Sequence, residues 1–205
     1  MRLKIILLLF FVVLIFRCAD NQDNSHFQNT SKITSTKEDS VKFFNYYSKL
    51  NVYGSPFKLV CGLDANVLYD KAPFLNYFNK NSETPLVVAG RVFSNNQFIT
   101  ILYGSVGDDI YPLLYSFNKY GVKVDSLDLT GDCSGDEGYL SSTSVTFKEN
   151  NDIIKVDSIK RFMVDELGEE IHGTDTTTIF NYKFTINIDG VFIKLDSTKK
   201  VISAQ

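Results

Sequence analysis

The sequence lacks tryptophan, and its 205 residues include only two histidines, three cysteines and four prolines. With so few histidines and no C-x-x-C pair, the ligand patterns of common zinc sites are missing. The 21 basic residues are outnumbered by 24 acidic ones, so the basic patch that nucleic acid needs is not expected. Glycine-rich phosphate loops are missing too. The composition therefore argues against nucleic-acid partners, nucleotide binding and a resident cofactor.

The first 18 residues combine a basic head, an apolar run and a cysteine. Arg2 and Lys4 precede the 12 apolar residues Ile5–Phe16, and Cys18 follows Arg17. A helix of 12 residues is about 18 Å long, whereas a helix needs about 20 residues to cross the hydrocarbon core of a bilayer. The segment therefore predicts an export signal rather than a membrane span.

This arrangement resembles the type II signal peptide of bacterial lipoproteins, in which cleavage exposes a cysteine that is then acylated. The resemblance implies a signal peptide over residues 1–17 and a lipid, such as palmitate, on Cys18. It also implies a location in the cell envelope, anchored to a membrane on the non-cytoplasmic side. An uncleaved N-terminal anchor is the alternative, because Arg17 stands where the family carries a small residue.

Polar residues dominate the stretch that follows the predicted lipidation site. Phe27 and Ile33 are the only large apolar side chains between Cys18 and Lys37, too few to offset the entropy of ordering the chain. We therefore expect a flexible tether over residues 18–37. The remaining residues, 38–205, are enough for one domain with a core of its own.

From Leu86 onward, apolar and polar residues alternate with the period of a β-strand. Asn and Gly turn signals separate the segments, and Asp189-Gly190 is the strongest hairpin signal. The pattern predicts a mainly β fold, an antiparallel up-and-down meander of about eight strands. The predicted strands are Leu86–Ser94, Gln97–Gly104, Tyr111–Asn118, Val122–Thr130, Ser142–Lys148, Ile153–Val164, Thr176–Ile188 and Val191–Asp196.

The segments before this meander differ in pattern. Helical spacing of apolar residues predicts short helices over Glu38–Leu50 and Asp70–Lys80, with Phe57–Cys61 extended between them. Within the meander, Gln97–Gly104 is apolar on both faces, so this strand is expected to be central.

The domain as a whole resembles small, uncharacterised single-domain lipoproteins of Gram-negative bacteria. The residues that carry the resemblance are Ile110–Asp128, the Gly- and Asp-rich loop after them, and Ile188–Phe192. The resemblance implies a fold class and a location, and it carries over no catalytic residues.

In a single meander, alternate connections fall on the same edge of the sheet. This rule places three long connections on one edge of the sheet: Gly104–Ile110, Gly131–Ser142 and Asp165–Asp175. Together they hold ten acidic residues and no lysine or arginine. We call this predicted feature the acidic rim. Its candidate binding residues are Asp108, Asp109, Asp132, Asp136, Glu137, Asp165, Glu169 and Asp175.

Clustered carboxylates raise one another's pKa unless a cation neutralises them. Ca²⁺ binds through six to eight oxygen ligands from flexible loops, so the acidic rim could hold Ca²⁺ or another cationic ligand. The sequence Gly131–Gly138 does not have the spacing of an EF-hand loop. The alternative is that these acids merely keep long loops soluble.

Two cysteines remain besides Cys18. Cys61 and Cys133 could form a disulfide in an oxidising compartment, or remain two unreactive thiols. Cys133, Ser134 or Ser141 could instead act as a nucleophile with His172, the one histidine in the predicted domain.

Three functional hypotheses follow from these features. The first is a lipid-anchored, non-enzymatic envelope protein that binds a glycan, a protein or a cation through the acidic rim. The second is a structural or assembly component of the envelope that acts through an edge of its sheet. The third is a hydrolase that uses His172.

Overall fold

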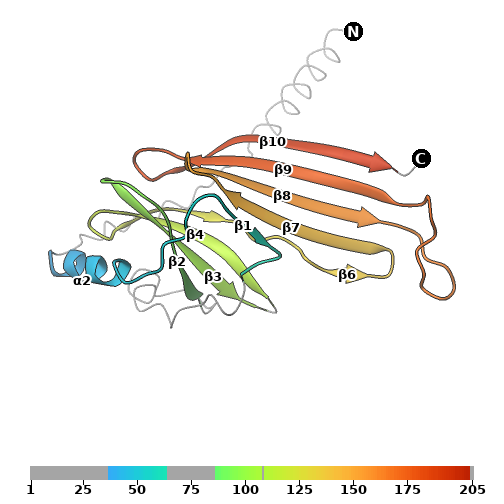
Figure 1. Ribbon diagram of the computed structural model, residues 1–205, viewed down its shortest axis with the longest axis horizontal. Coiled ribbons are helices and arrows are strands. Elements are labelled where there is room, and N and C mark those ends of the chain that lie inside the picture. Colours follow the sequence, from blue (N-terminus) through green and yellow to red (C-terminus); the bar gives the residue numbers. More distant parts are fainter. Residues whose placement is uncertain (1–36, 64–85, 108, 204–205) are drawn as a thin grey trace, which may run out of the picture. The chain divides into compact units, whose positions relative to one another are not determined.

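The computed structural model describes residues 37–63, 86–107 and 109–203, which form a mainly β domain (Figure 1). The predicted leader, tether and second helix at Asp70–Lys80 lie outside the described residues, as does Asp108. The elements are α2 (Lys37–Tyr47), β1 (Phe57–Val60), β2 (Leu86–Ser94), β3 (Phe98–Val106), β4 (Ile110–Asn118), β5 (Lys123–Asp128), β6 (Gly135–Asp136), β7 (Tyr139–Phe147), β8 (Asp152–Arg161), β9 (Thr176–Ile186) and β10 (Phe192–Ser203).

The strands form two antiparallel sheets instead of the single meander of about eight strands that the sequence predicted. One sheet has the order β2-β3-β4-β5, and the other has the order β1-β7-β8-β9-β10, with β6 paired to β7. The division arises because β1 pairs with β7, from Phe57↔Phe147 to Val60↔Ser144. β7 therefore lies beside β1 and not beside β5, the strand that precedes it along the meander.

The two sheets share a core at one end of the longer sheet. Phe147 is fully buried there, and its ring stacks on Phe57 with centroids 4.4 Å apart. Ile153 and Ile186 join the same cluster from β8 and β9, and Phe98 joins it from the smaller sheet. Burial of these side chains is the main force that holds the sheets together.

The predicted Asp189-Gly190 turn joins β9 to β10 and also ties the sheets together. Gly190 has φ +86°, which suits glycine, and its carbonyl accepts a hydrogen bond from the Ser116 side chain on β4. The backbone N–H of Phe192 donates to Asp125 Oδ2 at 2.9 Å. Two polar contacts thus add to the shared apolar core.

Helix α2 covers the other face of the smaller sheet, and this explains why β3 is apolar on both faces. Phe43 of α2 is buried, and its ring lies 5.1 Å from that of Phe117. Tyr103 of β3 belongs to this second core, whereas Leu102 belongs to the first. The prediction that this strand is central is confirmed, since β3 lies between β2 and β4.

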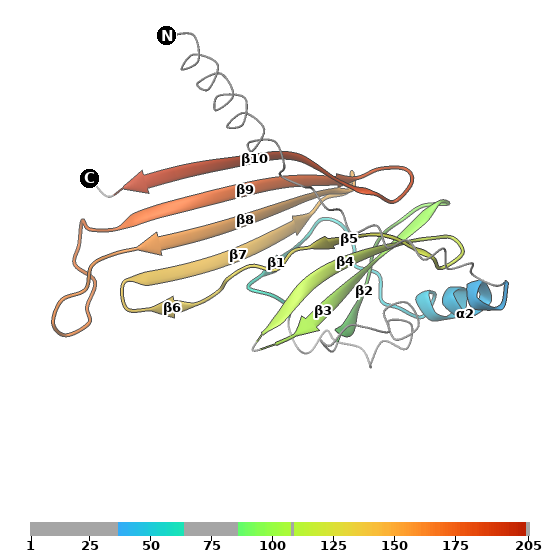
Figure 2. The same ribbon diagram turned by 180° about the vertical axis from the view of Figure 1, so that it is seen from behind.

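The shared core covers only part of the longer sheet. Ile153 pairs with Phe184, and both belong to the core. Further along the same face, Lys155 pairs with Tyr182 and Asp157 with Phe180, and these four side chains lie outside both core clusters. Figure 2 shows β7, β8, β9 and β10 side by side in this sheet. At the end of the sheet away from the Asp189-Gly190 turn, the side chains on this face therefore belong to neither core cluster.

Candidate functional site

The chain crosses from the smaller sheet to the larger one through residues 129–134. Leu129 is fully buried, and its N–H donates to Pro112 O at 3.1 Å. Four residues later Cys133 forms a disulfide with Cys61, across a sequence separation of 72 residues. The N–H of Cys61 donates to Thr143 O at 2.8 Å, which continues the β1–β7 ladder up to the disulfide. The crossing segment is therefore fixed to the larger sheet.

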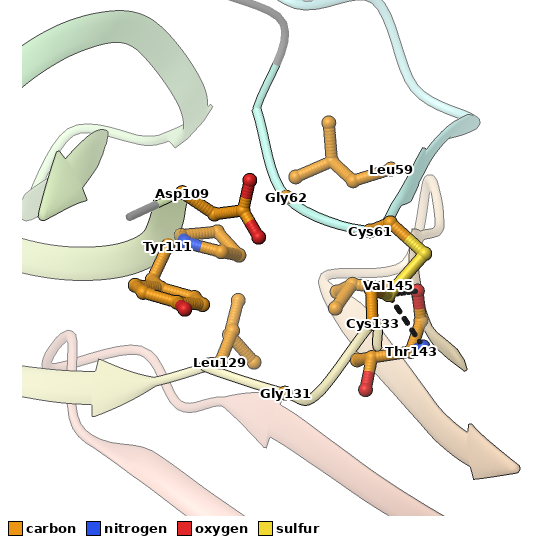
Figure 3. A pocket seen from close by; sticks show the side chains of 11 residues that line it. Leu59, Cys61, Gly62, Asp109, Tyr111, Leu129, Gly131, Cys133, Thr143 and Val145 are labelled. Carbon is orange, nitrogen blue, oxygen red and sulfur yellow. Dashed lines mark hydrogen bonds between the residues drawn. A yellow bond between two sulfur atoms is a disulfide. The ribbon is translucent and has the colours of Figure 1, made fainter. Parts of the chain in front are cut away.

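A small cavity lies against the disulfide (Figure 3). Its volume is about 10 Å³, with Leu59, Cys61, Asp109, Tyr111 and Cys133 among its lining residues. A single water needs roughly 10–15 Å³ of such space. The cavity is therefore too small for an organic ligand.

A larger hollow of about 280 Å³ lies over the part of the larger sheet that the described core clusters do not reach. We call it the β7–β9 cleft, because those three strands supply its floor. The crossing segment forms one wall. Its lining includes Thr130, Asp132, Ser141, Thr143, Lys155, Asp157, Ile159, Phe180 and Tyr182.

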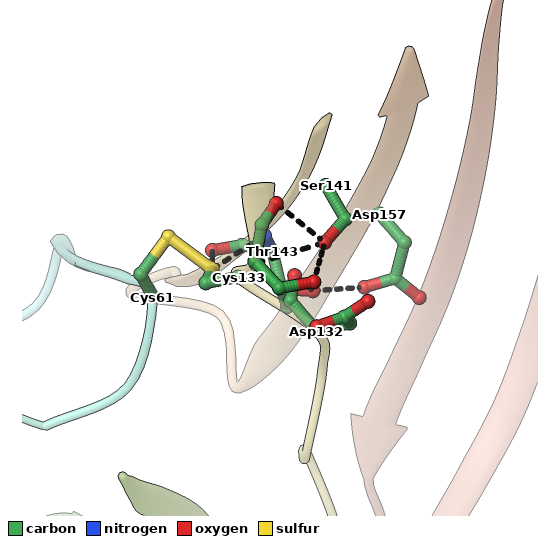
Figure 4. The surroundings of a disulfide bond; sticks show 7 residues. Cys61, Asp132, Cys133, Ser141, Thr143 and Asp157 are labelled. Atoms are coloured by element: carbon green, nitrogen blue, oxygen red, sulfur yellow. Dashed lines mark hydrogen bonds between the residues drawn. A yellow bond between two sulfur atoms is a disulfide. The ribbon is translucent and has the colours of Figure 1, made fainter. Parts of the chain in front are cut away.

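Hydrogen bonds fix the polar side chains in the middle of the β7–β9 cleft (Figure 4). Thr143 Oγ1 donates to Asp157 Oδ1 at 2.7 Å. Lys155 Nζ lies 3.3 Å from Asp157 Oδ2 and donates to Thr130 O at 2.5 Å. Asp157 therefore has a neighbouring cation and a neighbouring hydroxyl, and its orientation is defined before any ligand binds.

A second polar group lies where the crossing segment enters the cleft. The Tyr139 hydroxyl donates to Asp132 Oδ2 at 2.9 Å. Hydrogen bonds from Ser134, Tyr139 and Ser141 hold the pKa of Asp132 below its usual range. Ser134 and Ser141 lie 3.1 Å apart through their hydroxyl oxygens. Asp132 is thus an ionised acceptor beside a pair of hydroxyl groups.

Two aromatic rings complete the floor of the cleft. Phe180 and Tyr182 alternate along β9 on the same face as Asp157 and Lys155. The Lys155 ammonium lies 5.7 Å from the Tyr182 ring centroid, within the range of a cation–π contact. The cleft therefore offers ring surface, hydroxyls and charges of both signs within one hollow.

This arrangement offers groups that can bind a polar organic molecule. A sugar combines C–H faces, which pack on aromatic rings, with hydroxyls that pair with carboxylates, serine and threonine. Cys133 is bonded to Cys61 and is not a free thiol. The hypothesis that Cys133 acts as a nucleophile with His172 is therefore wrong. His172 lies exposed in the connection from β8 to β9.

The residues of the predicted acidic rim are divided between the two sheets. Asp109 lies at the end of the β3–β4 connection in the smaller sheet, and Asp132 lies in the segment that crosses between the sheets, whereas the other described members belong to the larger sheet. The premise of one sheet with one rim is therefore wrong. Asp132 lies in the β7–β9 cleft, Asp136 and Glu137 lie at the β6–β7 turn, and Asp165, Glu169 and Asp175 lie between β8 and β9.

Several of these loop acids have local structural roles. Asp165 Oδ1 accepts hydrogen bonds from the N–H groups of Leu167 and Glu169, both at 2.9 Å. Glu170 in the same connection forms an ion pair with Lys160 at 2.6 Å. In the part of the chain that the structure describes, no three His, Cys, Asp or Glu side chains are placed to hold a metal ion. Ca²⁺ binding by these loops thus stays a prediction.

Sequence reasoning named Asp132 and Ser141 but missed the other groups of the cleft. Alternation along Thr176–Ile188 places Phe180 and Tyr182 on one face of a strand, but it does not show what lies over that face. A usable signal was the neighbouring strand, whose matching positions are Lys155 and Asp157. Charged residues paired across from aromatic ones indicate a face that water reaches.

Comparison with known proteins adds no assignment: no family model matches the chain, and neither do curated proteins or solved structures. Over the described residues, none of the helices has the length and apolar character to cross a membrane.

Proposed function

We propose that this chain is a lipid-anchored, non-enzymatic protein of the cell envelope whose β domain binds a glycan in the β7–β9 cleft. The observation that carries the binding role is the cleft itself, where Phe180 and Tyr182 lie beside Asp132, Asp157 and Thr143. Hydroxyls and carboxylates held in place before binding lower the entropic cost of capturing a polar ligand.

The envelope location rests on the leader and is supported by the disulfide. Disulfides persist outside the reducing cytosol, and both cysteines of the described domain are joined in one. A short apolar run ending at Cys18, followed by a disulfide-bonded domain, is consistent with export and acylation.

The anchor can be tested by labelling cells with a palmitate analogue and separating their membranes. The intact chain should carry label and sediment with membranes, whereas Cys18→Ala should do neither. Arg17→Ala is the matched control, because it changes the neighbouring residue and keeps the acceptor thiol. Equal labelling of the Cys18→Ala variant would disprove acylation at this position.

Glycan binding can be tested on an array of peptidoglycan fragments and lipopolysaccharide oligosaccharides. Tyr182→Ala should weaken binding at least about tenfold, since loss of an aromatic contact costs roughly 1.4 kcal/mol. Phe44→Ala is the control, because Phe44 is an aromatic residue of α2 that is 56% exposed and remote from the cleft in the chain's fold. Binding that survives Tyr182→Ala unchanged would exclude the cleft as the site.

A second candidate function is that of an assembly component acting through a sheet edge. The observation that favours it is β10, the last strand of the larger sheet, which has 12 residues and one described strand neighbour. A long edge strand offers unpaired backbone groups to an incoming strand. This function needs a partner that can pair along β10.

A further inference from the structure

β10 is the longest strand of the described chain and lies at the end of the six-stranded sheet. Its inner side pairs with β9 from Phe192↔Ile186 to Ser203↔Thr176. Every residue from Ile193 to Ser203 is exposed. Leu195 and Val201, two large apolar side chains, are 50% and 54% exposed. The strand therefore presents both apolar surface and a row of outward backbone groups.

Soluble proteins usually protect such an edge by making it short, charged or bulged. β10 has one irregularity, a shift in register between Lys194 and Asp196. Beyond it, Asp196–Ser203 pairs with β9 without interruption. Eight regular residues are longer than the usual strand of about five or six, so the length of this edge does not protect it from pairing.

We propose that β10 pairs with β10 of a second copy of this chain, antiparallel about a two-fold axis that passes through Thr198. This inference rests on the sheet-edge function proposed above and names its partner. Most homo-oligomers are two-fold dimers in which one surface patch meets itself. A suitable patch must therefore be complementary to itself, and the sequence of β10 can be examined for that property.

The two-fold axis restricts the registers that are allowed. Residues directly opposite in an antiparallel pair share one face of the sheet. The axis must therefore pass midway between the two copies of one residue, and each register is named by that residue. An axis through Lys199 or Lys200 would place that lysine opposite its own copy. Like charges directly opposite are destabilising, so both of these registers are disfavoured.

The register centred on Thr198 has the opposite property. It places Asp196 of each copy opposite Lys200 of the other, which gives two pairs of opposite charge. Both side chains lie on the face of Thr198, because they pair with β9 at Lys183, Asn181 and Ile179 in steps of two. Ser197 then lies opposite Lys199, with no charge of like sign.

The apolar residues of the edge also fit this register. Val201 lies immediately beyond Lys200, and Leu195, the residue at the shift in register, lies immediately before Asp196, so Val201 of one copy comes near Leu195 of the other. Opposite apolar side chains bury part of the surface that a single copy leaves exposed. Charge complementarity thus favours the axis at Thr198, and the apolar residues at both ends of the segment are consistent with it.

Cysteine crosslinking in membranes of cells that make the full chain tests the pairing directly. Thr198→Cys should give a dimer that is resistant to detergent and sensitive to reductant, because the axis places position 198 opposite itself. Asn181→Cys is the matched control, since Asn181 pairs with Thr198 on the inner strand β9 and should give no dimer. Equal dimer yields from both variants would overturn the proposal.

A charge exchange tests the register. In the Thr198→Cys background, Asp196→Lys should lower the dimer yield at least about fivefold, because it opposes lysines in two pairs. Adding Lys200→Asp should restore the yield, since the opposite charges are merely exchanged. Failure of restoration in a variant that keeps the native circular dichroism spectrum would overturn the register. If the Thr198→Cys variant forms crosslinks to a different protein alone, self-pairing is overturned and the sheet-edge function still stands.

Discussion

Removal of the Cys61–Cys133 disulfide should lower the free energy of unfolding by about 4 kcal/mol. The bond closes a loop across a sequence separation of 72 residues, and loop-closure entropy for that length corresponds to about 4.4 kcal/mol at 25 °C. The loop contains all four strands of the smaller sheet. In the unfolded chain, the bond therefore restricts the conformations of the segment that folds into the smaller sheet.

The native structure should change little when the bond is removed. The N–H of Cys61 donates to Thr143 O, and the β1–β7 ladder reaches from there to Phe147. These contacts do not need the sulfur atoms. The predicted loss of stability thus arises mainly from greater freedom of the unfolded state.

Urea unfolding of a Cys61→Ala/Cys133→Ala double variant measures the effect. Because the chain has no tryptophan, circular dichroism or tyrosine fluorescence should follow the transition. The intact protein treated with reductant should match the double variant, and reductant should leave the double variant unchanged. A loss of less than about 1 kcal/mol would refute the account, because the loop would then contribute little to the unfolded entropy.

Three further variants test the packing and the charges. Phe147→Ala should cost about 3–5 kcal/mol in urea unfolding because Phe147 is fully buried between the sheets, whereas Phe44→Ala should change stability by less than about 1 kcal/mol. Gly121→Ala should cost about 1–3 kcal/mol, because φ is +78° and a Cβ would lie 2.6 Å from the Phe43 ring. Gly54→Ala, with open space around it, is its control. A hydrogen bond from Lys183 lowers the pKa of Asp152. The stability that it gives is complete above the unfolded pKa of about 3.9 and is lost as the pH falls through the folded pKa. Asp152→Asn should therefore flatten the decline of the urea midpoint below about pH 4, and equal declines would contradict this assignment.

The sequence predicted the local elements of the fold well, because their causes are local. Period-two alternation located β2 to β5 and β7 to β10 within a few residues, although β10 runs well past its predicted end at Asp196. The Asp189-Gly190 turn followed from its left-handed glycine. The helix predicted over Glu38–Leu50 matches α2 closely.

The division into two sheets could not be predicted in the same way. It depends on β1 pairing with β7, and the paired residues are 84 to 90 positions apart in the chain. Alternation shows which side chains share a face, but not which strand lies alongside. The prediction of an acidic rim was wrong for this reason, because it assigned the three loops to one edge of a single sheet by counting connections.

The end of the larger sheet that lies outside the described core clusters links the two proposed functions physically. Along β9, Phe184 enters the core, while Phe180 and Tyr182 on the same face line the β7–β9 cleft. Lys199 of β10 pairs with Phe180, and its ammonium lies 5.5 Å from that ring. Pairing of two β10 strands would place a second cleft on the same face of a continuous sheet, because a two-fold axis perpendicular to the sheet keeps each face on its own side. A ligand with repeating units could then span both clefts, and its avidity would exceed the affinity of one cleft. A repeating glycan should therefore bind the intact chain more tightly than the Asp196→Lys variant, whereas a single repeat unit should bind both equally.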